Sequence, residues 1–158
     1  MMKAEYINPF ILSAREVLGI EINSPVSLGQ MSLEDSKLMA KEVKVHLGIT
    51  GGLEGVVFYG MSIDTACELT SIMLGEKIEE MDATVQSAIA ELGNVISGTA
   101  SGLLEKAGFI TDITTPTVVI GSGAVIKTMS LKPLLITLTT DVGEIVLMVA
   151  LRQPGNKD

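Results

Sequence analysis

Tryptophan is absent from the sequence, and the other aromatic residues are few: three phenylalanines and two tyrosines among 158 residues. Nine methionines and many aliphatic residues take their place, which indicates an adaptable, mainly aliphatic core. Hydrophobic residues make up 47% of the chain and charged residues 19%, which argues against intrinsic disorder. The length fits a single domain, residues 1–158, that is large enough to bury a core.

Basic residues and cysteines are also scarce. The formal net charge is −8, and because neutralising phosphates takes a basic surface, this balance argues against a nucleic-acid partner. The single cysteine, Cys67, cannot form a disulfide within the chain, which favours a reducing compartment. No stretch reaches the roughly 18 uncharged apolar residues of a membrane span, and the N-terminal residues lack a signal-peptide pattern. We therefore expect a cytoplasmic protein that does not insert into membranes.

The order of predicted elements repeats along the chain. The first half, about residues 5–75, predicts a helix capped by Asn8 with Pro9 at its first position, then a strand, a hairpin that turns at 51–52, and a further helix. The second half, about residues 82–151, predicts a long helix from Asp82 to about 107, a strand in 114–125 and a hairpin that turns at 141–143. This order suggests an internal duplication. The expected fold is α+β, with about six mostly antiparallel strands packed against long helices.

The long helix at 82–107 contains three glycines, Gly93, Gly98 and Gly102, each of which costs about 1 kcal/mol relative to alanine. On a helical wheel the predicted core stripe consists of Val85, Ala88, Ile89, Leu92, Val95, Ile96, Thr99 and Leu103. The opposite face carries Ser87, Glu91, Asn94, Gly98, Ser101 and Glu105. Glu91 and Asn94 stand at i and i+3, so both side chains are expected on one exposed ridge.

Small residues surround this acid–amide pair, where a solvated helix face would normally carry long polar side chains. We interpret them as a docking surface for another protein, formed by Ser87, Ser97, Gly98, Ser101 and Gly102. A carboxylate can pair with a cation across an interface, and a carboxamide can orient a water molecule without titrating. The pair therefore suggests hydrolysis of an electrophile that a partner protein supplies.

At these residues the sequence resembles the CheC, CheX and FliY phosphatases of bacterial chemotaxis, and CheX most closely. The resemblance rests on "ELGN" at 91–94, on "INPF" at 7–10, on the glycine-turned hairpin and on the repeated layout. It implies that Asn94 aligns a water molecule against the aspartyl phosphate of a CheY-like response regulator. It further implies that Glu91 contacts a lysine of the regulator, that Mg²⁺ belongs to the regulator, and that the chain forms a homodimer.

A second Glu-x-x-Asn pair, as in CheC-type members, occurs as Glu5 and Asn8 in "EYIN". If Asn8 caps the first helix, Glu5 lies outside the helix and the i, i+3 geometry is lost. We therefore expect this pair to be a degenerate second site and the chain to have one working site. We expect no metal or other cofactor on this chain.

Two other classes of function stay open from the sequence. A non-catalytic relative would dock a response regulator or flagellar-switch component through the same ridge without hydrolysis. A hot-dog thioesterase would wrap one long helix in an antiparallel sheet, but the additional predicted helices at 9–18 and 62–74 count against it. The sequence does not name the regulator, and it does not separate motility from another two-component pathway.

Overall fold

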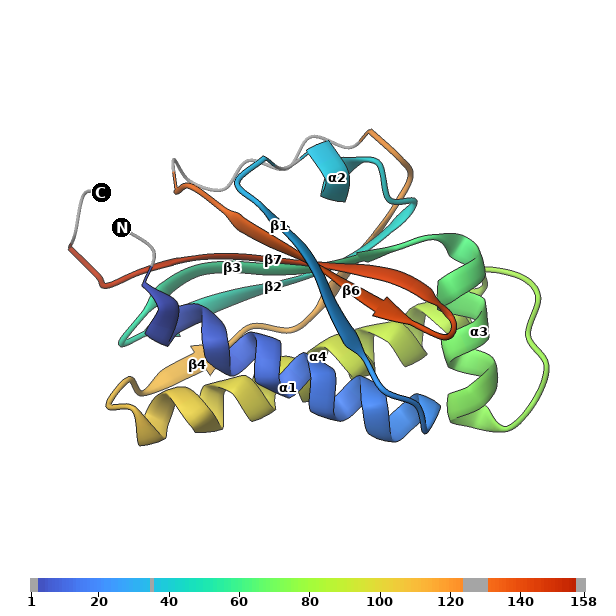
Figure 1. Cartoon of the computed structure of the whole chain (residues 1–158), viewed down its shortest axis with the longest axis horizontal. Coiled ribbons are helices and arrows are strands. Elements are labelled where there is room, and N and C mark those ends of the chain that lie inside the picture. The colour runs from blue at the N-terminus through green and yellow to red at the C-terminus, as the bar shows by residue number, and fades with distance from the viewer. Residues whose placement is uncertain (1–2, 35, 124–130, 156–158) are drawn as a thin grey trace.

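The computed structural model describes residues 3–34, 36–123 and 131–155. Its helices and strands form the sheet and the helical layer drawn in Figure 1. In chain order they are α1 (Ala4–Ile22), β1 (Ser27–Ser32), α2 (Ser36–Met39), β2 (Val43–Gly51), β3 (Glu54–Met61), α3 (Ile63–Leu74), α4 (Ala83–Lys106), β4 (Thr111–Ile113), β5 (Thr117–Ile120), β6 (Leu134–Thr140) and β7 (Gly143–Arg152).

One seven-stranded sheet organises the fold, in the order β1-β6-β7-β3-β2-β4, and β5 also pairs with β2. Every pairing is antiparallel. The predicted α+β class with an antiparallel sheet is confirmed, with one strand more than the expected number of about six. Both hairpins occur where the sequence predicts them: Ile49 pairs with Gly55 beside the turn of β2–β3, and Thr140 pairs with Gly143 beside the turn of β6–β7.

Helices α1 and α4 lie side by side on one face of the sheet and enclose the main core, while the short α2 lies near the other face (Figure 1). Strand β7 is buried on both faces. Ile145, Leu147 and Val149 join the core beneath the long helices, whereas Val146 and Met148 join a second cluster with Leu38 of α2. The uninterrupted apolar run in this strand is typical of a strand that is covered on both faces.

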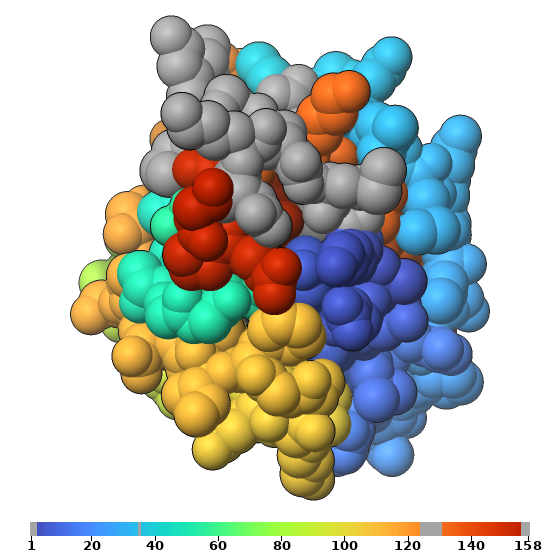
Figure 2. Space-filling view, turned by 90° about the vertical axis from the view of Figure 1, so that its left-hand side faces the viewer, coloured from blue at the N-terminus to red at the C-terminus, as the bar shows by residue number. Residues whose placement is uncertain are grey.

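The start of α1 differs from the prediction. The helix begins at Ala4 with Lys3 as its N-cap, and Pro9 lies inside it. Proline inside a helix removes one backbone hydrogen bond, but Tyr6 and Ile7, which precede it, are buried with Phe10 in the core. Burial of these side chains holds the first turn in the helix. The start of α1 lies next to the end of α4 (Figure 2). There the rings of Tyr6 and Phe109 pack edge to face, with 5.4 Å between the ring centroids.

The ends of α3 and α4 agree with the sequence signals. Asp82 caps α4 by accepting a hydrogen bond from the Val85 backbone N–H at 3.0 Å, and Gly108 follows the helix with a φ of 100°. Gly75 ends α3 in the left-handed conformation. Of the strand predicted within 114–125, β5 forms Thr117–Ile120, and residues 124–125 lie outside the described residues.

Candidate functional site on helix α4

Gly93 allows α4 to approach the sheet closely. A Cβ atom placed there would lie 2.9 Å from Cγ1 of Val45 and 3.4 Å from Cδ2 of Tyr59. A larger residue would therefore force the helix or the side chains of Val45 and Tyr59 to shift. One of the three helix glycines is explained by the packing of the core.

Ser97, one turn further along, contacts the same part of the sheet. Its hydroxyl shares a hydrogen bond of 2.8 Å with the hydroxyl of Tyr59, and both side chains are buried. Burial raises the pKa of Tyr59, so this phenol stays protonated and available for the bond. Ser97 is therefore not part of a docking surface, and that prediction is wrong. Nothing in the local sequence around Tyr59 indicated this contact.

The buried face of α4 is rotated relative to the predicted stripe. Val95 is 42% exposed and Thr99 is exposed, although both were placed in the core. The buried residues are Val85, Ile89, Leu92, Gly93, Ile96, Ser97, Ala100 and Leu104. The helical wheel ranked residues by hydrophobicity, whereas close contact with the sheet selects small side chains.

Glu91 and Asn94 lie together on the outer face of α4, Glu91 exposed and Asn94 half-buried. They are three residues apart in an unbroken helix, so their side chains project from adjacent positions. Within the described parts of the chain, neither side chain has a hydrogen-bond or ion-pair partner. Both polar groups are therefore available to another molecule.

The residues next to the Glu91–Asn94 pair along the outer face of α4 are small. A Cβ atom at Gly98 or Gly102 would meet no atom within 4 Å, so neither glycine is required by packing. Ser87 is exposed, whereas Ser101 is half-buried and its hydroxyl donates to the carbonyl of Thr111 at 3.0 Å. We call the line of Ser87, Glu91, Asn94, Gly98 and Gly102 on the outer face of this helix the α4 ridge.

The Glu5–Asn8 pair on α1 has the same helical spacing as the Glu91–Asn94 pair on α4. Because the helix begins at Ala4, Glu5 and Asn8 stand at i and i+3 within it, and both are exposed. The expectation that Pro9 would exclude Glu5 from the helix is wrong. The two pairs differ one turn further on: α4 has Gly98 four residues after Asn94, while α1 has Leu12 four residues after Asn8. Leu12 is 56% exposed, so its side chain protrudes beside Asn8.

The other polar residues show no second catalytic arrangement in the described ranges. No group of three or more His, Cys, Asp or Glu side chains there is placed to hold a metal ion. The ring of His46 lies against that of Phe58, with 4.7 Å between centroids and 38° between the ring planes, and partial burial lowers the pKa of His46. Cys67 is buried, and its burial raises the thiol pKa, which suits packing more than reactivity. None of the helices in the described part of the chain is long and apolar enough to cross a membrane.

Comparisons with known proteins agree with this architecture. The family model for the chemotaxis phosphatase CheX matches residues 43–139. The CheY-P phosphatase CheX of Thermotoga maritima is 37% identical over 133 residues, which cover 80% of this chain and 82% of that protein. A CheC-like superfamily protein from Shewanella sp. PV-4 has a TM-score of 0.86 and 27% identity, covering 96% of this chain and 99% of its own. A CheX–CheY–BeF₃–Mg²⁺ complex from Borrelia burgdorferi contains a chain with a TM-score of 0.81 and 28% identity, covering 94% of this chain and 98% of that one.

Proposed function

The chain belongs to the CheX family of chemotaxis phosphatases, and we propose that the α4 ridge accelerates hydrolysis of the aspartyl phosphate of a CheY-like response regulator. The observation that carries this proposal is an acid–amide pair, Glu91 and Asn94, without internal partners on a helix face stripped of large side chains. A relative from Borrelia burgdorferi has been solved in complex with CheY, BeF₃ and Mg²⁺, which supports a regulator as the partner. The hot-dog alternative fits poorly, because two long helices lie on the sheet in place of one.

Asn94 is the group that we assign to the attacking water. Its side-chain carbonyl accepts a hydrogen bond from the water and holds the water oxygen in line with the bond from phosphorus to the aspartyl oxygen. The water oxygen bonds to phosphorus as that bond breaks, which releases inorganic phosphate and the free aspartate carboxylate. Positioning accounts for much of the catalysis of phosphoryl transfer, so one well-placed amide is sufficient chemistry from this chain.

Glu91 is the group that we assign to docking. A carboxylate here pairs with a lysine beside the phosphorylated aspartate, which fixes the regulator with its phosphoryl group over Asn94. We place the Mg²⁺ ion on the regulator and assign no metal or other cofactor to this chain. Since such regulators act in the cytoplasm, the cytoplasmic location expected from the sequence is part of this proposal.

We also propose that the chain forms a homodimer. Both β6 and β7 are paired on their two edges inside the sheet. Among the described residues, the sheet ends at β1 on one side and at β4 and β5 on the other, and β1 is the end strand that exposes Leu28 and Met31. Exposed edges with apolar side chains tend to pair with another strand, and a second copy of β1 is such a strand.

The proposal is tested by following the decay of the phosphorylated response regulators of the same genome in the presence of wild-type protein, Asn94→Ala and Glu91→Lys. We expect wild-type protein to accelerate decay of at least one regulator. Asn94→Ala should reduce the maximal rate by at least about 100-fold with little change in half-saturating concentration, because it loses only the positioned water. Glu91→Lys should mainly raise the half-saturating concentration, because it places like charges together.

Full activity of Asn94→Ala would remove this amide from the mechanism. Binding of a phosphorylated regulator by wild-type protein without faster decay would favour the non-catalytic docking function. Since the assay compares all regulators of the genome, it also identifies the partner and separates motility from another two-component pathway.

A further inference from the structure

A groove lies between the end of α3 and the first turns of α4. Its volume is about 490 Å³, and its lining residues are Leu74, Ala83, Thr84, Ser87 and Ala88. Leu74 forms its apolar wall and is 49% exposed, so its side chain is available to another molecule. The alanines opposite are small enough to leave the groove open.

The walls of this groove are fixed by hydrogen bonds. Gly75 turns the chain away from the helix axis, and the hydroxyl of Ser71 accepts from the backbone N–H of Ile78 at 2.9 Å. Asp82 anchors the first turn of α4 by capping the backbone N–H of Val85. This open groove is therefore preformed.

The groove is continuous with the α4 ridge. Ser87 belongs to both, and Glu91 follows it by one helical turn on the same face. A partner that contacts Glu91 and Asn94 therefore covers the open side of the groove as well.

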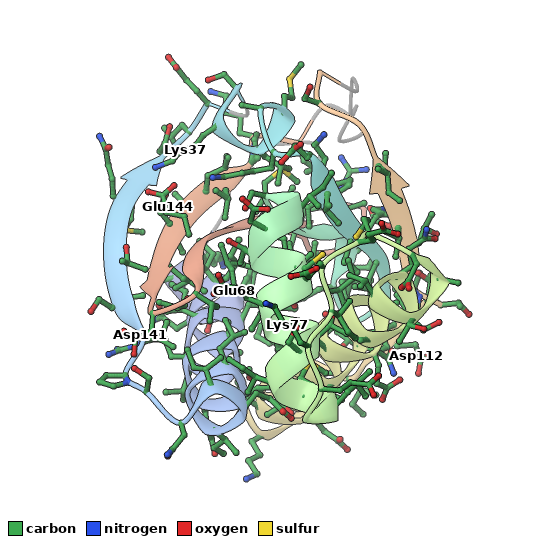
Figure 3. All side chains as sticks on the ribbon, turned by 90° about the vertical axis from the view of Figure 1, so that its right-hand side faces the viewer. Lys37, Glu68, Lys77, Asp112, Asp141 and Glu144 are labelled. Atoms are coloured by element: carbon green, nitrogen blue, oxygen red, sulfur yellow. The ribbon has the colours of Figure 1, made fainter. Side chains whose placement is uncertain are left out.

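The charges of the stretch that contributes α3 and α4 to the groove are almost all negative. Between Ile63 and Leu104, Lys77 is the only basic residue, and its ammonium group lies 3.1 Å from a carboxylate oxygen of Glu79. Figure 3 shows Glu68 and Lys77 on the face of the molecule that α3 presents. The acidic residues of this stretch are Asp64, Glu68, Glu76, Glu79, Glu80, Asp82 and Glu91. A surface of this kind complements a cationic partner.

We propose that this groove is a second anchor for the response regulator, and that it receives an apolar side chain from a cationic surface next to the regulator's phosphorylation site. This inference rests on the proposed function, since it assigns the groove to the same partner as the α4 ridge. The ridge contacts the reacting groups, whereas the groove selects which regulator binds. Leu74 is accordingly a specificity-determining residue without contact to the phosphoryl group.

The test measures binding of wild-type protein and three variants to each response regulator of the same genome, loaded with beryllofluoride and Mg²⁺. Leu74→Ser should weaken binding about five- to tenfold, because a half-buried leucine no longer packs against the partner. Ile72→Ser is the matched control: Ile72 is 44% exposed on the same helix and does not line the groove, so binding should not change. Thr84→Trp, which fills the groove from an exposed position, should weaken binding as Leu74→Ser does.

In the decay assay, Leu74→Ser should raise the half-saturating concentration and leave the maximal rate unchanged. Equal effects of Leu74→Ser and Ile72→Ser, or unchanged binding by both groove-altering variants, would overturn the inference. Sedimentation could instead show that Leu74→Ser dissociates a dimer while regulator affinity is unchanged. That result would assign the groove to a second copy of the chain and would also overturn the inference. Because binding needs no hydrolysis, a wild-type protein that binds through Leu74 without accelerating decay would refute the proposed catalysis alone.

Discussion

The hydroxyl groups of Tyr59 and Ser97 meet directly beneath the turn of α4 that carries Asn94. Their bond of 2.8 Å is buried in a region where Gly93 lets the helix backbone approach Val45 and Tyr59. A water held by an amide must be aligned closely with the phosphorus atom, so the rotation and depth of α4 affect catalysis. We regard Tyr59 as a positioning residue, because it acts on Asn94 only through the helix.

Tyr59→Phe is expected to lower the maximal rate of regulator dephosphorylation several-fold with the half-saturating concentration unchanged. The substitution leaves the buried Ser97 hydroxyl without its partner, which costs about 1–3 kcal/mol of the free energy of unfolding. The double variant Tyr59→Phe/Ser97→Ala removes both polar groups and should recover part of the rate. Melting temperature and steady-state kinetics together provide the measurement. A stability loss with an unchanged maximal rate would show that the bond only stabilises the fold.

At the scale of elements, α4 uses its glycines in two ways. Gly93 faces the sheet and is required by packing, whereas Gly98 and Gly102 face open space. The sequence alone could locate the helix, its Asp82 cap and its Glu-x-x-Asn pair, because capping and periodicity are local. It could not distinguish the glycine that packing requires from the two that face open space. A helical wheel ranks residues by hydrophobicity and contains no information on how closely the sheet approaches the helix. For the same reason Ser97 was assigned to the surface and Val95 to the core.

The glycines can be separated by experiment. Gly98→Leu should leave the melting temperature equal or higher, because helix propensity improves by up to about 1 kcal/mol. It should nevertheless abolish dephosphorylation, because a leucine one turn beyond Asn94 holds the phosphoryl group away. Gly93→Ala should instead lower the melting temperature, since its Cβ would lie 2.9 Å from Val45 Cγ1. Retained activity in Gly98→Leu, or loss of its fold, would contradict the docking role of the α4 ridge.

The same reasoning applies in reverse to α1, where Leu12 occupies the place that Gly98 has in α4. Leu12→Gly should expose the Glu5–Asn8 pair to a regulator at the cost of about 1 kcal/mol of helix stability. In an Asn94→Ala background, we expect this change to restore slow regulator dephosphorylation, measured as decay of the phosphorylated regulator. Adding Asn8→Ala should remove the restored activity. If Leu12→Gly restores nothing, a feature other than the leucine keeps the α1 pair inactive.

At the scale of the whole molecule, the sequence predicted the fold class and both central hairpins because each is encoded by contiguous patterns. Glycine turns and apolar strand runs do not depend on distant partners. The start of α1 depends on burial of Tyr6 and Ile7 against residues far along the chain, so the local proline signal gave the wrong boundary. The groove at Leu74 likewise joins the ends of two helices and has no signature in either. The duplication of halves stays a prediction, and the order of elements is consistent with it.

Assembly can be tested at the exposed edge of β1. If two copies pair there, Met31→Lys should weaken the dimer, because Met31 is exposed on that strand and two added charges would face each other across the interface. Sedimentation equilibrium at micromolar concentration should show a dimer for wild type and a shift toward monomer for the variant. A strictly monomeric wild-type protein would contradict the homodimer. Thr99→Lys, on the exposed face of α4, serves as a control for the added charge.

The central strand β7 gives the molecule an internal standard for hydrogen exchange. It is hydrogen-bonded to β3 on one side and to β6 on the other, and residues 145–150 are buried on both faces. Their amide hydrogens can reach deuterated water only when the sheet as a whole opens, so their exchange rates report global unfolding. Amides in α4 can exchange through local opening of the helix. The ratio of the two rates separates a substitution that loosens only the catalytic helix from one that weakens the entire protein.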